Sequence, residues 1–115
     1  MTWIYKVCGA AEWAAAEASG HYEGSADDRR DGFIHFSAAS QLAATLARHF
    51  AGRDDLVLIA VEAEALGEAL KWEPSRGGDL FPHLYAALPV AAALWTKPLP
   101  RDASGRHVIP SEARG

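Results

Sequence analysis

Three side chains suited to acid–base chemistry stand in short segments that we expect to be extended: His35, Glu73 and His83. In a strand, alternation places His35 on the same face as Ser37, just before a predicted helix. An imidazole and a hydroxyl beside the backbone N–H groups of a helix N-terminus suit a small pocket for a phosphate or a sugar hydroxyl. The alternative is a buried histidine bonded to the backbone, with Ser37 only capping the helix.

A second array lies in residues 81–85, where the same alternation gathers Phe81, His83 and Tyr85 on one face. Aromatic rings beside an imidazole suit stacking on a planar base or nicotinamide ring. The alternative is an ordinary half-buried edge segment with an aromatic cluster, because Pro82 cannot donate a ladder hydrogen bond.

Glu73 precedes a glycine-rich turn that carries Arg76. Its carboxylate could act as a general base or stabilise a developing cation, and Arg76 could hold a phosphate. The alternative is a solvated Glu–Arg pair. Farther back, Arg29 and Arg30 could form a lid over an anionic ligand, although the neighbouring aspartates, Asp27, Asp28 and Asp31, neutralise much of their field.

The sequence offers no cysteine pair and no His-x-x-x-His spacing, so we expect no metal centre. A metal-dependent hydrolase that uses His21, His35 and His83 is therefore the weakest functional hypothesis. The single cysteine, Cys8, excludes an internal disulfide framework and favours a reducing compartment.

The elements that must position these residues alternate between sheet and helix. Residues 3–7 predict an opening strand, and residues 10–19, between Gly9 and Gly20, predict a helix. Residues 21–32 have no apolar periodicity and predict a loop. Residues 33–36 predict a strand. Ser37 is then expected to be the N-cap of a second helix, which has an apolar stripe and ends at Gly52.

The second half of the chain predicts several strands. Residues 56–61 are continuously apolar, which indicates a central strand covered on both faces. Residues 63–70 offer at most a turn of helix, and further extended segments are expected at residues 71–73, 80–85 and 90–94. We predict one domain over residues 1–115, with an irregular tail from about residue 98. The fold class is α+β: a small curved or split antiparallel-rich sheet with two main helices.

Composition narrows the function classes. The 115 residues carry a net charge of −4 and are half hydrophobic, which suits a single core without disulfides. A pI near 5.7 argues against a nucleic-acid partner. The longest apolar run, residues 84–95, is too short to span a bilayer, and the N-terminus has no signal-peptide pattern, so we expect a cytoplasmic protein without a membrane segment.

The combination of four segments resembles a bacterial domain-of-unknown-function family, number nine hundred and fifty-two. The segments are Ile-Tyr-Lys at 4–6, residues 31–37 followed by Gln41, Trp-Glu-Pro at 72–74 and Phe-Pro-His-Leu-Tyr at 81–85. The similarity covers residues 3–110. The resemblance implies a fold akin to the ADP-ribosyltransferases and RNA 2′-phosphotransferases, without an established reaction.

That wider superfamily binds NAD, or an ADP-ribosylated intermediate, in a cleft between two small sheets, so the resemblance implies a ligand of this kind. It places Lys6 at a first-strand position where a histidine is common, and His35 and Ser37 on the middle strand. A lysine there could clamp a phosphate as a point charge. His83 stands where a transferase keeps its catalytic carboxylate, with Glu73 as a substitute.

The leading hypothesis is a cleft that binds a nucleotide-like or phosphorylated small ligand. In a transferase, Lys6 and His35 would hold phosphate or ribose, Tyr85 would stack on the base, and Glu73 or His83 would act as acid or base. The alternative is a non-catalytic ligand-binding or protein-interaction module on the same fold. The sequence leaves open the ligand, catalysis, protein partners and the oligomeric state.

Overall fold

The computed structural model describes residues 1–114, except for the side chain of Arg76. Its α-helices are α1 (Ala10–Ser19), α2 (Ala26–Asp31) and α3 (Leu42–His49). Its strands are β1 (Trp3–Gly9), β2 (His21–Tyr22), β3 (Ile34–His35), β4 (Leu56–Glu62), β5 (Leu70–Pro74), β6 (Leu80–Leu84), β7 (Leu88–Pro89) and β8 (Ala93–Pro98). Segments of 3-10 helix span Ala39–Gln41, Ala63–Ala69, Arg76–Gly78 and Val90–Ala92, and the second and third are interrupted at Gly67 and Gly77.

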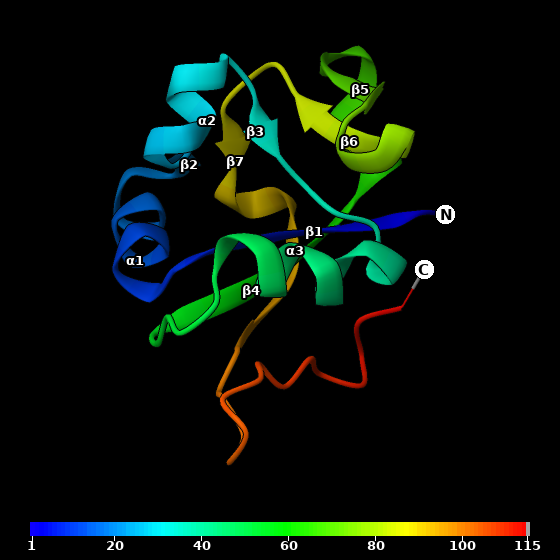
Figure 1. Ribbon diagram of the computed structural model, residues 1–115. Helices are drawn as coiled ribbons and strands as arrows, with labels where there is room; N and C mark the ends of the chain where they lie inside the picture. The colour runs from blue at the N-terminus through cyan, green and yellow to red at the C-terminus, as the bar shows by residue number, and fades with distance from the viewer. Residues whose placement is uncertain (115) are drawn as a thin grey trace.

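The largest body of the fold is an antiparallel sheet with the strand order β1-β4-β8 (Figure 1). The central strand β4 is the apolar run predicted from the sequence, and its Leu58, Ile59, Ala60 and Val61 are fully buried. One face packs against α1, where Trp13 anchors a core with Ile4 and Cys8. The other face packs against α3 through Leu42 and Leu46. The prediction of a strand covered on both faces is confirmed.

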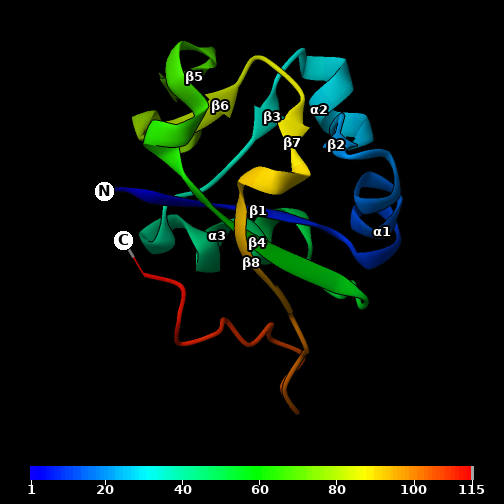
Figure 2. The ribbon, with the colours of Figure 1, turned by 180° about the vertical axis from the view of Figure 1, so that it is seen from behind.

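A second antiparallel sheet, β3-β6-β5, lies beside the central sheet, and a short pair, β2-β7, completes the strand pairing of the described residues (Figure 2). Cross-strand partners in the second sheet include His35 with His83 and Glu73 with Phe81. The α+β class and the split, antiparallel character of the sheet are confirmed. The molecule has a third α-helix, α2, beyond the two main helices expected.

The two larger sheets are joined at the free edge of β1. The backbone N–H of Tyr5 donates to the carbonyl of Ser37 at 2.8 Å, and the N–H of Ser37 donates back at 2.9 Å. Ser37 lies two residues after the end of β3, so this bridge places β3 close to β1. Side chains from both sheets therefore face one shared space.

The prediction that residues 21–32 form a loop is wrong, because they hold β2 and α2. Ser25 caps α2: its hydroxyl accepts from the N–H of Asp28, whose carboxylate accepts from the N–H of Ser25 in return. The helix ends at Gly32, which has a φ of 85°. Six residues rich in charge carry no apolar periodicity, which is why the pattern alone predicted a loop.

Three other expectations need correction. Ser37 does not cap a helix, because α3 begins at Leu42 after a 3-10 turn, and its hydroxyl bonds to that of Thr45 at 2.9 Å. The helix predicted between Ser37 and Gly52 is also shorter in the structure, where α3 ends at His49. Residues 90–94 are not one strand: Val90–Ala92 form a 3-10 turn before β8.

The irregular tail predicted near residue 98 begins after β8, and its described part returns along the face that carries α3 (Figures 1 and 2). Leu99 is buried in the α3-side core, and Ile109 and Ala113 pack against that core. At its end, the backbone N–H of Arg114 donates to the hydroxyl of Tyr5 at 2.7 Å, and that hydroxyl donates to the carbonyl of Arg114. The end of the tail is thus hydrogen-bonded to β1 through the side chain of Tyr5.

Candidate functional site

A pocket of about 150 Å³ lies where the two larger sheets meet. Residues of β1 line one wall, residues of β3 and β6 line the other, and α2 contributes at the rim. The lining residues that matter for chemistry are Tyr5, Lys6, Asp28, Arg30, Asp31, His35, Ser37, Phe81 and His83. No tryptophan belongs to the described lining.

The wall formed by the β3-β6-β5 sheet gathers side chains through strand alternation. His35, His83 and Lys71 are successive cross-strand partners, so they form a row across one face of the sheet. Glu73 and Phe81 form the next row on that face. The sheet register therefore places both histidines and the glutamate side by side.

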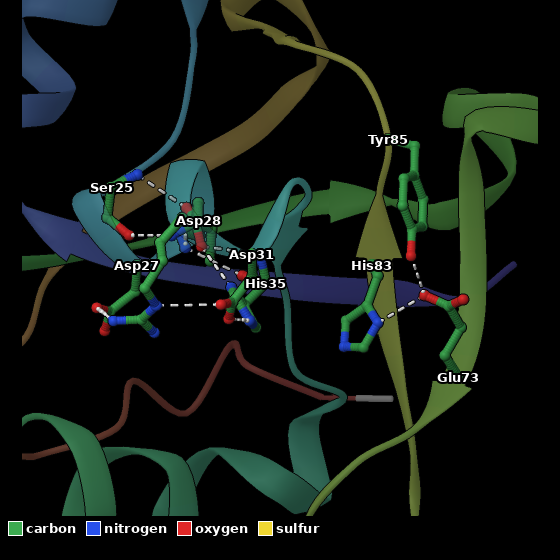
Figure 3. A network of polar contacts seen from close by, with 10 residues as sticks. Ser25, Asp27, Asp28, Asp31, His35, Glu73, His83 and Tyr85 are labelled. Carbon is green, nitrogen blue, oxygen red and sulfur yellow. Dashed lines mark hydrogen bonds and ion pairs between the residues drawn. The ribbon is translucent and has the colours of Figure 1, made fainter.

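His83 is held in one orientation by Glu73. Its Nδ1 lies 2.8 Å from Glu73 Oε1, and the hydroxyl of Tyr85 donates to the same oxygen at 2.7 Å (Figure 3). Because an ionised carboxylate only accepts, Nδ1 must carry the proton of this bond. The Tyr85 hydrogen bond, followed by that of His83, lowers the pKa of Glu73. The glutamate is thus an anion that fixes the tautomer of the imidazole.

The other ring nitrogen of His83 points away from Glu73 (Figure 3). Among the described residues Nε2 has no hydrogen-bond partner, although the side chain is only 6% exposed and lines the pocket. With Nδ1 protonated, Nε2 carries a lone pair that can accept a proton from a bound group. A carboxylate on one ring nitrogen and a pocket at the other is an arrangement that suits a general base.

Phe33 packs between the aromatic members of this wall. Its ring stacks on that of His83, with centroids 4.0 Å apart and an interplanar angle of 27°. It also contacts the rings of His35 and Tyr85, at 4.6 and 5.3 Å between centroids. The two imidazoles lie 5.6 Å apart in an edge-on arrangement. Phe33 therefore spaces the two histidines and fixes the plane of His83.

The opposite half of the site is built on a buried carboxylate, Asp28, which is 2% exposed. Asp28 Oδ2 accepts from the ammonium of Lys6 at 2.8 Å, and Oδ1 lies 2.6 Å from Nδ1 of His35. The N–H groups of Ser25 and His35 also donate to this carboxylate. Burial alone would raise the pKa of Asp28, but the hydrogen bond from His35 and the charge of Lys6 hold it far below its usual range.

His35 also touches a second carboxylate. Its Nε2 lies 3.0 Å from Oδ2 of Asp31, whose Oδ1 accepts from Nε of Arg30 at 3.2 Å. Both nitrogens of the ring thus lie within ion-pair distance of carboxylate oxygens. The hydrogen bond from Arg30 lowers the pKa of Asp31. Arg30 and the carboxylates of Asp27 and Asp31 therefore place charges of both signs at the pocket rim.

The structure brings together six of the seven residues singled out from the sequence. Lys6, His35, Ser37 and His83 line the pocket, and Glu73 and Tyr85 stand directly behind His83. The seventh, Arg76, has a side chain outside the described part of the structure. The ammonium of Lys6 donates to Asp28 and to the carbonyl of His35, so its charge is shared inside the protein.

Sequence reasoning missed the roles of Asp28, Asp31 and Phe33. Ser25 and Asp28 have the spacing of a capping box, a signal that predicts a helix start at this place. No local pattern indicates that the same aspartate is buried against Lys6, 22 positions away in the chain. Phe33 was expected on the His35 face, but its stacking on His83 depends on the pairing of β3 with β6.

Neither a metal centre nor a membrane segment emerges from the described residues. They contain no cluster of three or more His, Cys, Asp or Glu side chains that could hold a metal ion. No helix among residues 1–114 is both long and apolar enough to cross a bilayer.

The fold and the pocket define a class: a small α+β protein in which two antiparallel sheets meet around a polar pocket whose lining includes His35, His49 and His83. Residues 7–96 match the family described as "Protein of unknown function (DUF952)". This match covers most of the chain, so the chain belongs to that family, and the predicted family membership is confirmed; three of the four segments noted in the sequence lie within the matched residues. The comparison with curated proteins finds no match.

Solved structures of one relative have the same fold. The crystal structure of CC0527 from Caulobacter crescentus is 54% identical, with a TM-score of 0.90, and the alignment covers 93% of this chain and 94% of that one. The solution NMR structure of CC0527 is 56% identical, with a TM-score of 0.83 and coverage of 92% and 91%. At this identity and coverage, the architecture described above is shared with that relative.

Proposed function

We propose that this protein binds a small phosphorylated, nucleotide-like ligand in the pocket between its two larger sheets, and that His83 exchanges a proton with it. The observation that carries the proposal is the orientation of His83. A carboxylate and a tyrosine hydroxyl hold one side of the ring, and the other nitrogen is left to the pocket. Such preparation is typical of a general acid–base residue.

The remaining residues have roles in the same scheme. The second imidazole, His35, presents Nε2 at the rim, where a protonated ring can hold an anionic oxygen. Lys6 and Asp28 act behind it as positioning residues, because their charges neutralise each other within the protein. Ser37 adds a hydroxyl to the pocket wall, Tyr85 orients Glu73 and offers a partly exposed ring, and Arg76 is proposed as a phosphate ligand.

The chemistry that fits is group transfer related to ADP-ribosyl or 2′-phosphate transfer, with NAD or an ADP-ribose-like molecule as the ligand. His83 would accept a proton at Nε2 from the attacking hydroxyl and return it to the leaving group, while Glu73 stabilises the imidazolium. A pocket between two small sheets supports kinship with the ADP-ribosyltransferase-like fold. We place this activity in the cytoplasm and on small ligands, since a net charge of −4 disfavours RNA.

One observation favours a second candidate, a non-catalytic ligand-binding module. Oxygen Oε1 of Glu73 accepts from both His83 and Tyr85. A transferase that forms a ribosyl cation needs a carboxylate facing that cation. Glu73 is engaged with its neighbours instead, so the same pocket could recognise a ligand without transforming it.

The test is ligand titration with a catalytic readout. NAD, ADP-ribose and AMP are added to the purified protein while the melting temperature and binding heat are measured. A probe at about a hundred times its dissociation constant should raise the melting temperature by about 10 °C, since mass action stabilises the folded state. No response to any of the three would overturn both candidates.

His83→Gln separates enzyme from module. We expect this variant to keep binding within about tenfold but to lose turnover of the bound probe by about a hundredfold or more. His21→Gln is the matched control, because His21 is exposed on β2 and lies outside the described lining of the pocket. Binding without turnover of any probe in the native protein would leave the module as the function.

A further inference from the structure

The carboxylate of Asp31 stands at the place where a ligand anion would be expected. One of its oxygens meets Nε2 of His35 at 3.0 Å, and the other accepts from Nε of Arg30 at 3.2 Å. A guanidinium nitrogen and an imidazole nitrogen thus converge on the two oxygens of one group. This is the geometry with which proteins bind carboxylates and phosphates.

Asp31 contributes little else to the fold. It is the last residue of α2, where the partial negative charge of the helix C-terminus disfavours a carboxylate. Its side chain is 35% exposed, in contrast to that of Asp28 at 2%. Asp28 already fixes Nδ1 of His35, so the second carboxylate is unnecessary for orienting the ring.

We propose that Asp31 is an internal stand-in for the ligand's anionic group and that binding displaces it from His35 and Arg30. This inference rests on the phosphorylated ligand of the proposed function and adds a specificity device to it. A neutral ligand has nothing to exchange for the lost ion pair. A phosphoryl group, with its greater charge, takes over both donors, so Asp31 selects for the more highly charged ligand.

Displacement needs a side chain that can leave without disturbing the site. Asp31 meets this condition, because rotation of an exposed aspartate at a helix end breaks only its contacts with Arg30 and His35. Arg30 then keeps its second partner, Asp27, at 2.9 Å. His35 keeps its bond to Asp28, so the imidazole stays in place for the ligand.

The experiment compares two alanine variants of the same helix. Asp31→Ala removes the stand-in. Asp27→Ala also removes one negative charge that pairs with Arg30, but Asp27 is not one of the carboxylates that contact His35. This variant therefore measures how much the loss of one negative charge alone changes AMP affinity. AMP and adenosine are titrated into both variants and into the native protein at matched ionic strength. We expect AMP to bind Asp31→Ala on the order of threefold to fivefold more tightly than Asp27→Ala, with adenosine affinity equal in both.

A second readout observes displacement directly. In the native protein the carboxyl carbon of Asp31 should shift in the NMR spectrum on addition of AMP, and the carboxyl of Asp28 should not. Equal AMP affinity in the two variants, or weaker binding by Asp31→Ala, overturns the inference and leaves the proposed function standing. Failure of AMP to bind all three proteins overturns this inference, and the panel of NAD and ADP-ribose then decides whether the proposed function falls with it.

Discussion

Asp28 is the residue on which the site and the fold depend together. A carboxylate that is 2% exposed would be costly without partners, and here it has Lys6, His35 and two backbone N–H groups. Because Lys6 belongs to β1 and Asp28 to α2, their ion pair ties the helix to the central sheet. His35 joins the same carboxylate, so the position of a pocket residue is set by a structural bond.

Replacing one partner of this pair should be far more costly than replacing both. We expect Lys6→Met to lower the free energy of unfolding by about 3–5 kcal/mol, because it leaves Asp28 buried with its charge less well compensated. The double variant Lys6→Met/Asp28→Leu should lose less than the sum of its single changes. Urea unfolding of the four proteins provides this comparison.

Lys97→Met is the matched control for that series. Lys97 pairs with Glu112 at a longer distance, 3.7 Å, and is about one-third exposed. Exposed pairs contribute little, so this variant should unfold within about 1 kcal/mol of the native protein. A similar loss in Lys6→Met and Lys97→Met would contradict the importance given to burial.

At this scale, the sequence predicted those members of the site whose position follows from strand alternation. Alternation grouped His35 with Ser37 and His83 with Tyr85, but the pairing of β3 with β6, which brings the two histidines together, was not predicted. The dependence of Lys6 on Asp28 could not be predicted, because the pair is 22 residues apart and each charge looks like a solvated one in sequence. The phosphate-binding role proposed for Lys6 came from the family resemblance, which places it at the first-strand position.

Among the elements, the short helix α2 has the greatest influence on the pocket. It contributes Asp28, Arg30 and Asp31 to the lining of the pocket. Its start is fixed by Ser25 and by the preceding Gly24, which has a φ of 108°. A Cβ atom at position 24 would lie 2.8 Å from the Cβ of Asp28. Gly24 thus permits both the backbone turn and the close approach of the buried aspartate.

Gly24→Ala should therefore be more destabilising than Gly32→Ala at the other end of α2. Both glycines have positive φ, so both changes incur a backbone penalty of about 1 kcal/mol or more. Only the alanine at position 24 would also collide with Asp28, since nothing lies within 4 Å of a Cβ at Gly32. The midpoints of urea unfolding give the ranking, and equal midpoints would show that the contact with Asp28 relaxes freely.

The elements that sequence reasoning found are those with strong local signals. The helix between Gly9 and Gly20 and the apolar strand β4 have clear limits and periodicity, and both are confirmed. The failures lie where tertiary contacts override local preference. Ser37 has the composition of an N-cap, but its backbone is paired with Tyr5 and its hydroxyl with Thr45, so the helix starts five residues later.

For the molecule as a whole, the lowered pKa of Asp28 predicts sensitivity to acid. A carboxylate with a pKa lower in the folded than in the unfolded state stabilises the fold above its unfolded value of about 3.9. That contribution is lost as the pH falls through the acid range toward the folded pKa. The half-buried carboxylate of Glu73 and the exposed carboxylate of Asp54 have lowered pKa values as well, and their effect has the same sign.

The free energy of unfolding should therefore be level above about pH 5 and should fall steadily from there to pH 2. Urea titrations at a series of pH values measure it. In Asp28→Asn the fall should be shallower, whereas Asp102→Asn, on the exposed tail, should retain most of the native slope. A native protein with equal stability at pH 2 and pH 5 would contradict the environment assigned to Asp28.

The row formed by Lys71, His83 and His35 has a consequence for the insertions and deletions that the gene can tolerate. One residue inserted in β6 before His83 would shift the alternation of the strand by one position. His83 would then point toward the face of the sheet that carries Trp72. The same insertion among residues 75–79 would only lengthen a turn. Lineages of this family should therefore vary in length at that turn, and β6 should keep a fixed length wherever the chemistry is kept.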